Sequence, residues 1–253
     1  AVNGDDNNNG TTEQTPFKTL KKAIETAADG STIILLSNIP NTDFTKNPNY
    51  DWDRMGPRFE ISKPLTIESS DADNPVTVES AFVITGNGDY IFNNLNFKVA
   101  YPKGAIDYWD SNGNANITIT GCNFETPTNN PSSTGHGVKA VEISTKGKVI
   151  VDDCSFENKR SDYDTYHIEA LYIENASELK VTGTTFDGFP HIVRANVPDF
   201  EFSDNIIKNA PAQKGNNGLW VMWLANGELP SFTEAKVNAS GNQVDNGSGY
   251  DYA

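Results

Sequence analysis

The stretch Ile117-Thr-Ile-Thr-Gly-Cys-Asn-Phe124 decides the fold. Its first half alternates isoleucine with threonine, which is the period-two pattern of a strand with one buried face. Gly121 and Cys122 then interrupt the alternation, and glycine at such a break indicates a tight bend. An apolar residue, Phe124, follows the bend. The stretch therefore predicts a short strand that ends in a sharp corner.

The same pattern recurs along the chain. Five further segments superimpose on the first one: Tyr90–Phe97, Val149–Phe156, Leu179–Phe186, Phe200–Ile207 and Val237–Val244. Their sixth positions, in chain order, are Leu95, Cys122, Cys154, Thr184, Asn205 and Asn242, at successive spacings of 27, 32, 30, 21 and 37 residues. A constant motif at variable intervals predicts coils of short strands joined by loops of different length, with each coil burying its inward residues on the next.

A second set of apolar segments precedes these repeats and predicts another strand in each coil. Its members are Ala105–Trp109, Ala140–Ser144, Ala170–Glu174, Ile192–Ala195 and Leu219–Trp223. Toward the N-terminus we expect strands over Ser31–Ser37, Phe59–Glu68, Val76–Ala81 and Val83–Thr85. Each coil then consists of strand, bend, strand, bend and loop.

A single helix is expected, over residues 16–28. Pro16 suits a first helical turn, and Phe17, Leu20 and Ile24 follow at helical spacing before the stop at Asp29-Gly30. An amphipathic helix here would cover the open end of the first coil, which otherwise exposes strand edges. The chain 1–253 is expected to form one domain, with stacked coils over about residues 30–246.

The residues 3–35, NGDDNNNGTTEQTPFKTLKKAIETAADGSTIIL, resemble the opening of pectate-lyase-like right-handed β-helix proteins. The later ITITGCNF and LKVTGTTF segments resemble the coil repeats of that superfamily. The resemblance implies an all-β, right-handed parallel β-helix of the bacterial extracellular or surface type. The superfamily includes polysaccharide lyases, polygalacturonases, phage spikes and adhesins, so the resemblance does not set the function.

Composition narrows the class of partner. The formal net charge is −15, with 19 Lys and Arg against 34 Asp and Glu, which argues against nucleic acid and anionic membranes. No apolar run approaches the ~20 residues that span a bilayer. Abundant Asn, Ser, Thr and Asp fit a secreted or cell-surface protein, and we expect a monomer.

Stacking places equivalent residues of successive coils about 4.8 Å apart on one face. If the apolar residues of the second strand set point inward, Asp107, Glu142, Tyr172 and Arg194 form an outward column. Beside it would lie a row of Trp109, Ser144, Glu174 and Asn196, with Trp220 or Met222 continuing the surface in the last coil. A one-residue slip would turn the charged residues inward, which disfavours that register.

Such a face suits a glycan, because Trp and Tyr rings pack on sugar C–H groups while carboxylates and arginine bind hydroxyl or charged groups. The expected substrate-binding residues are Asp107, Trp109, Glu142, Tyr172, Glu174, Arg194 and Trp220. Asp107 and Glu142 could also share a Ca²⁺ ion, which takes several oxygen ligands. A solvated polar face without a ligand is the competing interpretation.

Three functions are compatible with this pattern. The favoured one is a non-catalytic carbohydrate-recognition or adhesive module. The alternative is a polysaccharide lyase, calcium-dependent if an ion binds at Asp107 and Glu142, with Arg194 as the base that acts on a uronate polymer. The third is a structural spacer. The polygalacturonase motifs do not match, because Gly135-His136-Gly137 precedes Asp152-Asp153 and no Arg-Ile-Lys follows.

The cysteines and histidines leave alternatives open. Cys122 and Cys154 occupy equivalent positions in adjacent coils, either as buried thiols, which we favour, or as a disulfide. His136, His167 and His191 each precede a strand of the second set, at different offsets, so structural roles are expected for at least two of them. The loops Thr126–Val138 and Asn158–Ile168, with Tyr163 and Tyr166, could wall a groove beside the column.

Overall fold

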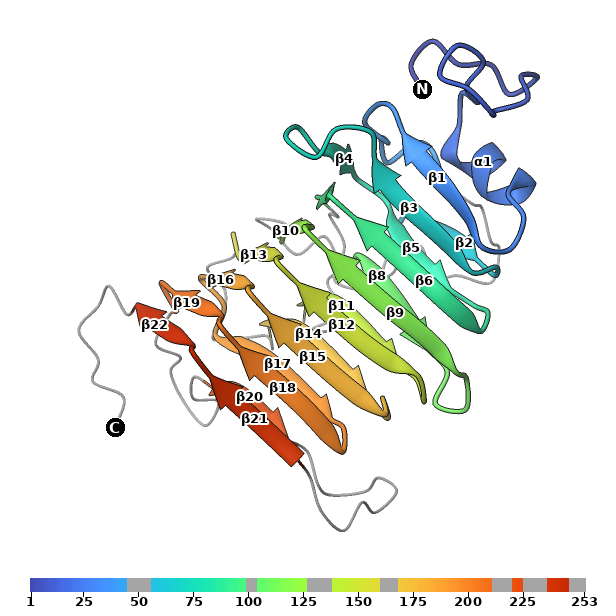
Figure 1. Ribbon diagram of the computed structural model, residues 1–253. Coiled ribbons are helices and arrows are strands. Elements are labelled where there is room, and N and C mark those ends of the chain that lie inside the picture. Colours follow the sequence, from blue (N-terminus) through green and yellow to red (C-terminus); the bar gives the residue numbers. More distant parts are fainter. Residues whose placement is uncertain are drawn as a thin grey trace.

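A computed structural model describes residues 1–44, 56–98, 104–126, 138–159, 168–210, 220–224 and 236–245, with the backbone alone for 220–224. This part of the chain is all-β: it contains one short helix and three parallel sheets (Figure 1). The prediction of a mainly parallel β fold is confirmed. None of its helices is long and apolar enough to cross a membrane.

Sheet A consists of β1 (Ser31–Leu35), β3 (Leu65–Ser69), β6 (Gly88–Asn93), β9 (Ala115–Thr120), β12 (Lys148–Asp152), β15 (Glu178–Thr182), β18 (Asp199–Ser203) and β21 (Lys236–Ser240). Sheet B consists of β4 (Val76–Val78), β7 (Leu95–Phe97), β10 (Asn123–Glu125), β13 (Ser155–Glu157), β16 (Thr185–Asp187), β19 (Ile206–Lys208) and β22 (Gln243–Asp245). Sheet C consists of β2 (Arg58–Ile61), β5 (Ala81–Ile84), β8 (Ile106–Trp109), β11 (Val138–Ser144), β14 (Ile168–Glu174), β17 (His191–Asn196) and β20 (Trp220–Leu224).

The chain visits the three sheets in a fixed order. From β2 onward each group of three strands adds one strand to sheet C, then to sheet A, then to sheet B. Each of these strands pairs in parallel with the strand three places later, so that β8, β11 and β14 lie side by side, as do β9, β12 and β15. This connectivity is the one expected of a parallel β-solenoid, as the stacked coils of Figure 1 show.

The corner between sheets A and B explains the turn residues of the repeat. The fifth position of each repeat has a positive φ, between 51° and 68°: Asn94, Gly121, Asp153, Gly183, Asp204 and Gly241. Glycine adopts this left-handed conformation freely, and Asn and Asp tolerate it better than other side chains do. The recurring Gly, Asn or Asp is therefore a backbone requirement of the corner.

We expect Asp153→Val to lower the free energy of unfolding by about 1–3 kcal/mol, because a β-branched side chain is strained at the φ of 51° that Asp153 adopts. Urea denaturation followed by circular dichroism measures the change. Asp153→Gly is the matched control and should leave stability unchanged or slightly raised. Equal losses in the two variants would show that the conformation of this corner is not what selects its residue.

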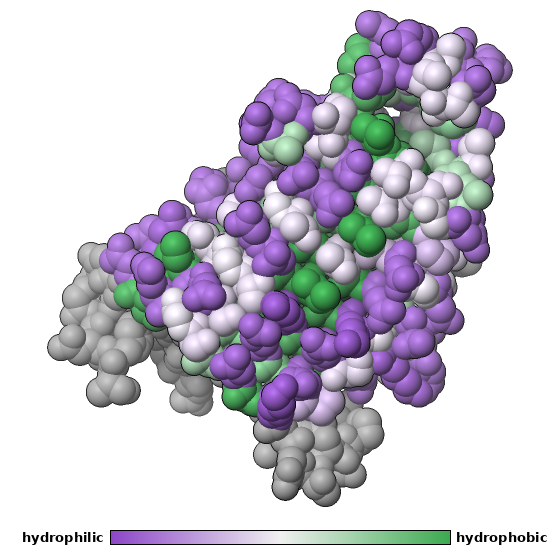
Figure 2. Space-filling model, in the orientation of Figure 1, coloured by the Kyte–Doolittle hydropathy of each residue, from purple (hydrophilic) through white to green (hydrophobic). Residues whose placement is uncertain are grey.

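The core lies between the sheets and is built from ladders of equivalent residues. Phe97, Phe124, Phe156 and Phe186 stack in register across sheet B, with successive ring centroids 4.9, 4.5 and 5.1 Å apart. All four are at least 97% buried. Outward residues are mostly polar: the face in Figure 2, over sheet A, is largely hydrophilic with small apolar patches.

The two cysteines are free thiols in this core, which confirms the favoured interpretation. Both are buried next to the corner between sheets A and B, and burial raises the pKa of both thiols, that of Cys154 to about 12. Their ladder continues as a polar chain, in which the Asn205 side chain accepts from the Thr184 amide and donates to the Asn242 side chain. These residues are structural.

The N-terminal predictions need correction. The helix α1 covers only Leu20–Thr26, shorter at both ends than the expected 16–28, with Thr19 as its N-cap. The Asp6 carboxylate accepts hydrogen bonds from the Lys18 and Thr19 amides, and Thr19 is extended, so the helix begins only after Thr19. Leu20 and Ile24 are buried, and Figure 1 shows the helix beside β1, so its capping position is as expected.

The segment predicted as one strand over Phe59–Glu68 forms two strands. The first, β2, belongs to sheet C and the second, β3, to sheet A. A turn at residues 62–64 separates them, and Pro64 has no amide hydrogen to offer a sheet ladder. The apolar residues alternate on both sides of this turn, so the sequence pattern alone reads as one continuous strand.

Candidate functional site

The register of sheet C places the predicted column as expected. Glu142 lies opposite Asp107 on one side and Tyr172 on the other, and Tyr172 lies opposite Arg194. The neighbouring row is also in register, since Ser144 pairs with Trp109 and with Glu174, which in turn pairs with Asn196. We call Asp107, Glu142, Tyr172 and Arg194 the charged column.

The last coil departs from the prediction. Trp223 pairs with Arg194 and continues the charged column, whereas Met222 pairs with Val193 and Trp220 pairs with His191. The segment Leu219–Trp223 is apolar throughout, so alternation does not set its register. The sequence analysis expected Trp220 or Met222 to continue this surface and did not single out Trp223.

Two carboxylates of the charged column are much more buried than an open face would make them. Asp107 is 4% exposed and Glu142 is 5% exposed. Each has a cation beside it: Arg58 Nη1 lies 3.4 Å from Asp107 Oδ2, and Lys139 Nζ lies 3.0 Å from Glu142 Oε1. Pairing of this kind is what makes buried charge tolerable. Arg58 was not predicted; it lies on β2, two coils before Asp107.

Tyr172 is the centre of the site. Lys139 Nζ lies 4.3 Å and Arg194 Cζ 4.7 Å from the centroid of its ring, both within cation–π range. The Tyr172 hydroxyl donates a hydrogen bond to Glu174. The pKa of Tyr172 is raised, mainly by burial and to a lesser extent by this hydrogen bond. The ring of Trp109 stacks on Tyr172 with centroids 5.6 Å apart and planes 26° apart. Trp109 itself is 51% exposed, so the pair presents an indole face to solvent.

Glu169 is a further acidic residue of the site that the sequence analysis did not single out. It is 1% exposed, and within the described part of the chain neither carboxylate oxygen has a hydrogen-bond partner. Arg194 Nη1 is 3.7 Å away, and the fully buried His191 is its neighbour on β17. Burial raises the pKa of Glu169, although Lys139 and Arg194 act in the opposite direction. The predicted strand began at Ala170, which left Glu169 outside the pattern.

We expect Glu169→Gln to stabilise the protein at neutral pH by on the order of 1 kcal/mol, because it removes a buried carboxylate without a hydrogen bond. The pKa of Glu169 is raised above its ordinary value of 4.5, so its contribution to stability is fully present below pH 4.5 and is lost as the pH rises through the folded-state pKa. Wild type and variant should therefore converge in acid and diverge toward pH 7. Thermal unfolding at a series of pH values tests this. A variant less stable than wild type at pH 7 would show that the ion pair with Arg194 outweighs the burial.

The calcium expectation gains no support from this geometry. Among the residues that the structure describes, no three His, Cys, Asp or Glu side chains converge as metal ligands would. Asp107 and Glu142 each face a cation, as described above. Of the histidines, His191 belongs to this site, whereas His136 and His167 lie outside the described residues, as do Tyr163, Tyr166 and most of the two loops expected to wall a groove.

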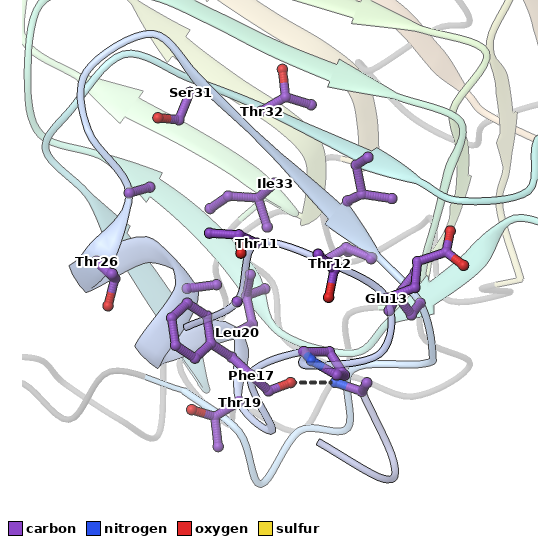
Figure 3. Close-up of a pocket in the computed structure, with 18 of the residues that line it drawn as sticks. Thr11, Thr12, Glu13, Phe17, Thr19, Leu20, Thr26, Ser31, Thr32 and Ile33 are labelled. Carbon is purple, nitrogen blue, oxygen red and sulfur yellow. Dashed lines mark hydrogen bonds between the residues drawn. The ribbon is translucent and has the colours of Figure 1, made fainter. Parts of the chain in front are cut away.

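A cavity of about 620 Å³ lies at the N-terminal end of the stack, between residues 9–13, α1 and β1 (Figure 3). Phe17, Leu20 and Ile33 supply apolar surface, and the threonines shown around them supply hydroxyl groups. The N-terminal amine of Ala1 donates a hydrogen bond of 2.9 Å to the carbonyl oxygen of Phe17 and so ties the start of the chain to the segment before α1. None of the described charged and aromatic residues of the sheet C site lines this cavity.

Comparisons with protein-family models, with curated proteins and with solved structures find no significant match to this chain. The assignment of a function therefore rests on the site itself.

Proposed function

We propose that the chain is a right-handed parallel β-helix of the pectate-lyase-like type. Crossovers between parallel strands of one sheet are right-handed in almost all proteins, and this chain makes such a crossover in every coil. The N-terminal helix beside the first strand and the Gly, Asn or Asp corner of each repeat support the same assignment.

The function that the geometry supports best is recognition of a polysaccharide along the outer face of sheet C, as an extracellular binding or adhesive module. The observation that carries this proposal is the half-exposed Trp109, held flat against Tyr172 and flanked by Glu174. A flat apolar ring packs on the C–H face of a sugar, and a carboxylate beside it accepts hydrogen bonds from hydroxyl groups.

The lyase alternative is less well supported. A lyase needs a group that takes a proton from the sugar and cations that neutralise the adjacent carboxylate. Arg194 lies beside the buried Glu169, and Lys139 is paired with Glu142, so both candidate cations are already engaged by carboxylates of the protein. A guanidinium also carries donors and no acceptor. The lyase remains an outcome of the test below.

The test is retention of the protein in affinity gels that contain one polysaccharide each. We expect retention by at least one glycan, and Trp109→Ala should weaken that binding by up to about 10-fold, since a stacked aromatic ring contributes about 0.5–1.5 kcal/mol beyond the area that it buries. Ile34→Ala is the matched control, because Ile34 is a comparably exposed apolar residue on sheet A.

Two outcomes would contradict the proposal. Retention by no glycan leaves the spacer interpretation. A rise in ultraviolet absorbance from an unsaturated sugar product, lost in Arg194→Ala, would establish the lyase.

A further inference from the structure

The cations of the candidate site all have carboxylate partners within the protein. Arg58 lies 3.4 Å from Asp107, Lys139 lies 3.0 Å from Glu142, and Arg194 lies 3.7 Å from Glu169. The three carboxylates are each at least 95% buried. An acidic ligand that approached these cations would have to compete with fixed carboxylates already in contact distance.

One carboxylate of the site is left without a cation. The Glu174 carboxylate accepts a hydrogen bond from the Tyr172 hydroxyl, and no lysine or arginine among the described residues forms an ion pair with Glu174. Glu174 is partly exposed and lies in the same row as Trp109, with the exposed Asp110 next in sequence to that tryptophan. Among the residues that the structure describes, the surface around the aromatic pair therefore has acceptors and negative charge, whereas its cations are paired with carboxylates.

From this arrangement we propose that the site binds an uncharged polysaccharide, recognised through its hydroxyl and C–H groups, and that it rejects glycans carrying carboxylate or sulfate. This inference rests on the proposed function and names the class of glycan. Sugar hydroxyls would donate to the Glu174 carboxylate, which also accepts from Tyr172, while one sugar face packs on Trp109. Specificity comes from the acidic groups as much as from the aromatic ring, because like charge repels the wrong ligand.

The net charge of the whole chain also disfavours the binding of polyanions. The chain carries a formal net charge of −15, and its field adds to the local repulsion of polyanions. Repulsion between charges in water is screened by salt, whereas stacking and hydrogen bonding to a neutral sugar are affected little. Salt dependence is therefore a signature that separates the two classes of ligand.

The experiment is isothermal titration calorimetry with soluble neutral oligosaccharides, a polyuronate and a sulfated glycan, each at about 0.02 M and about 0.2 M salt. We expect binding of a neutral oligosaccharide with an affinity that changes less than about twofold with salt, and no binding of either polyanion at the lower salt. Glu174→Gln should weaken the binding of the neutral ligand by about 5- to 10-fold, because the amide oxygen still accepts a hydrogen bond but lacks the charge that strengthens it.

Glu201→Gln is the matched control. Glu201 also accepts a hydroxyl hydrogen bond from a residue two positions away, Ser203, but it lies on sheet A, so its variant should bind as wild type does.

Binding of a polyanion that tightens at the lower salt would overturn the inference while leaving polysaccharide recognition intact. Binding of no glycan of either class would overturn the proposed function, and the inference with it. An unchanged affinity of Glu174→Gln for a neutral glycan would remove Glu174 from the site.

Discussion

Phe156→Ala is expected to lower the free energy of unfolding by about 3–5 kcal/mol, the range for removing a fully buried aromatic side chain. Phe156 is 0% exposed and stacks between Phe124 and Phe186, with ring centroids 4.5 and 5.1 Å away. Its loss leaves a cavity in the middle of the ladder and removes contacts with the coils on both sides. Urea denaturation followed by circular dichroism gives the difference, provided that refolding is reversible.

Val244→Ala provides the control for this ladder. Val244 lies on β22, the last strand of sheet B, and is 52% exposed, so its truncation should cost well under 1 kcal/mol. A loss of less than about 1 kcal/mol for Phe156→Ala would contradict a continuous aromatic core in sheet B.

Arg58→Met should be nearly as destabilising, by about 3–5 kcal/mol, because it leaves a buried carboxylate without its cation. The Arg58 side chain is 0% exposed, and that of Asp107 is 6% exposed. Desolvation of the remaining charge dominates the cost, rather than the loss of the 3.4 Å contact itself. Chemical denaturation at pH 7 measures the effect.

The companion variant is Asp107→Asn in the Arg58→Met background. Removal of the second charge should restore part of the lost stability, and the double-mutant cycle gives the coupling energy. Additive losses of unfolding free energy in the single and double variants would show that Arg58 and Asp107 are not coupled. That result would contradict the ion pair between them.

Much of the fold could be predicted because the decisive signals are local. Alternation located the strands of each repeat, and the Gly, Asn or Asp at the corner reflects a positive φ that the backbone requires there. The register of Asp107, Glu142, Tyr172 and Arg194 followed from the same alternation and is confirmed. A one-residue error would have exchanged buried and exposed faces, which is why alternation is informative.

The remaining features depend on contacts between distant segments. The start of α1 is set by Asp6, which lies far from Thr19 in the sequence but accepts hydrogen bonds from its backbone and side chain. The burial of Asp107 depends on Arg58, from a strand two coils away. No periodic pattern encodes such pairings, and in the uniformly apolar β20 even the register is not encoded locally.

The role of Glu169 was hidden for a related reason. Glu169 lies opposite Lys139 on β11 and opposite His191 on β17. Three neighbouring strands therefore have a polar residue at the same register position, just before their apolar residues. Extending each segment of the second strand set by one residue toward the N-terminus would have aligned Lys139, Glu169 and His191.

Hydroxyl-radical footprinting, with and without a glycan that binds, locates the polysaccharide site on the protein. We expect the glycan to protect Trp109 from labelling, while the exposed Val2, at the N-terminus, and Ile34, on sheet A, are labelled equally in both samples. Protection of Ile34 or of residues around the N-terminal cavity, with Trp109 unprotected, would contradict a polysaccharide site on the outer face of sheet C.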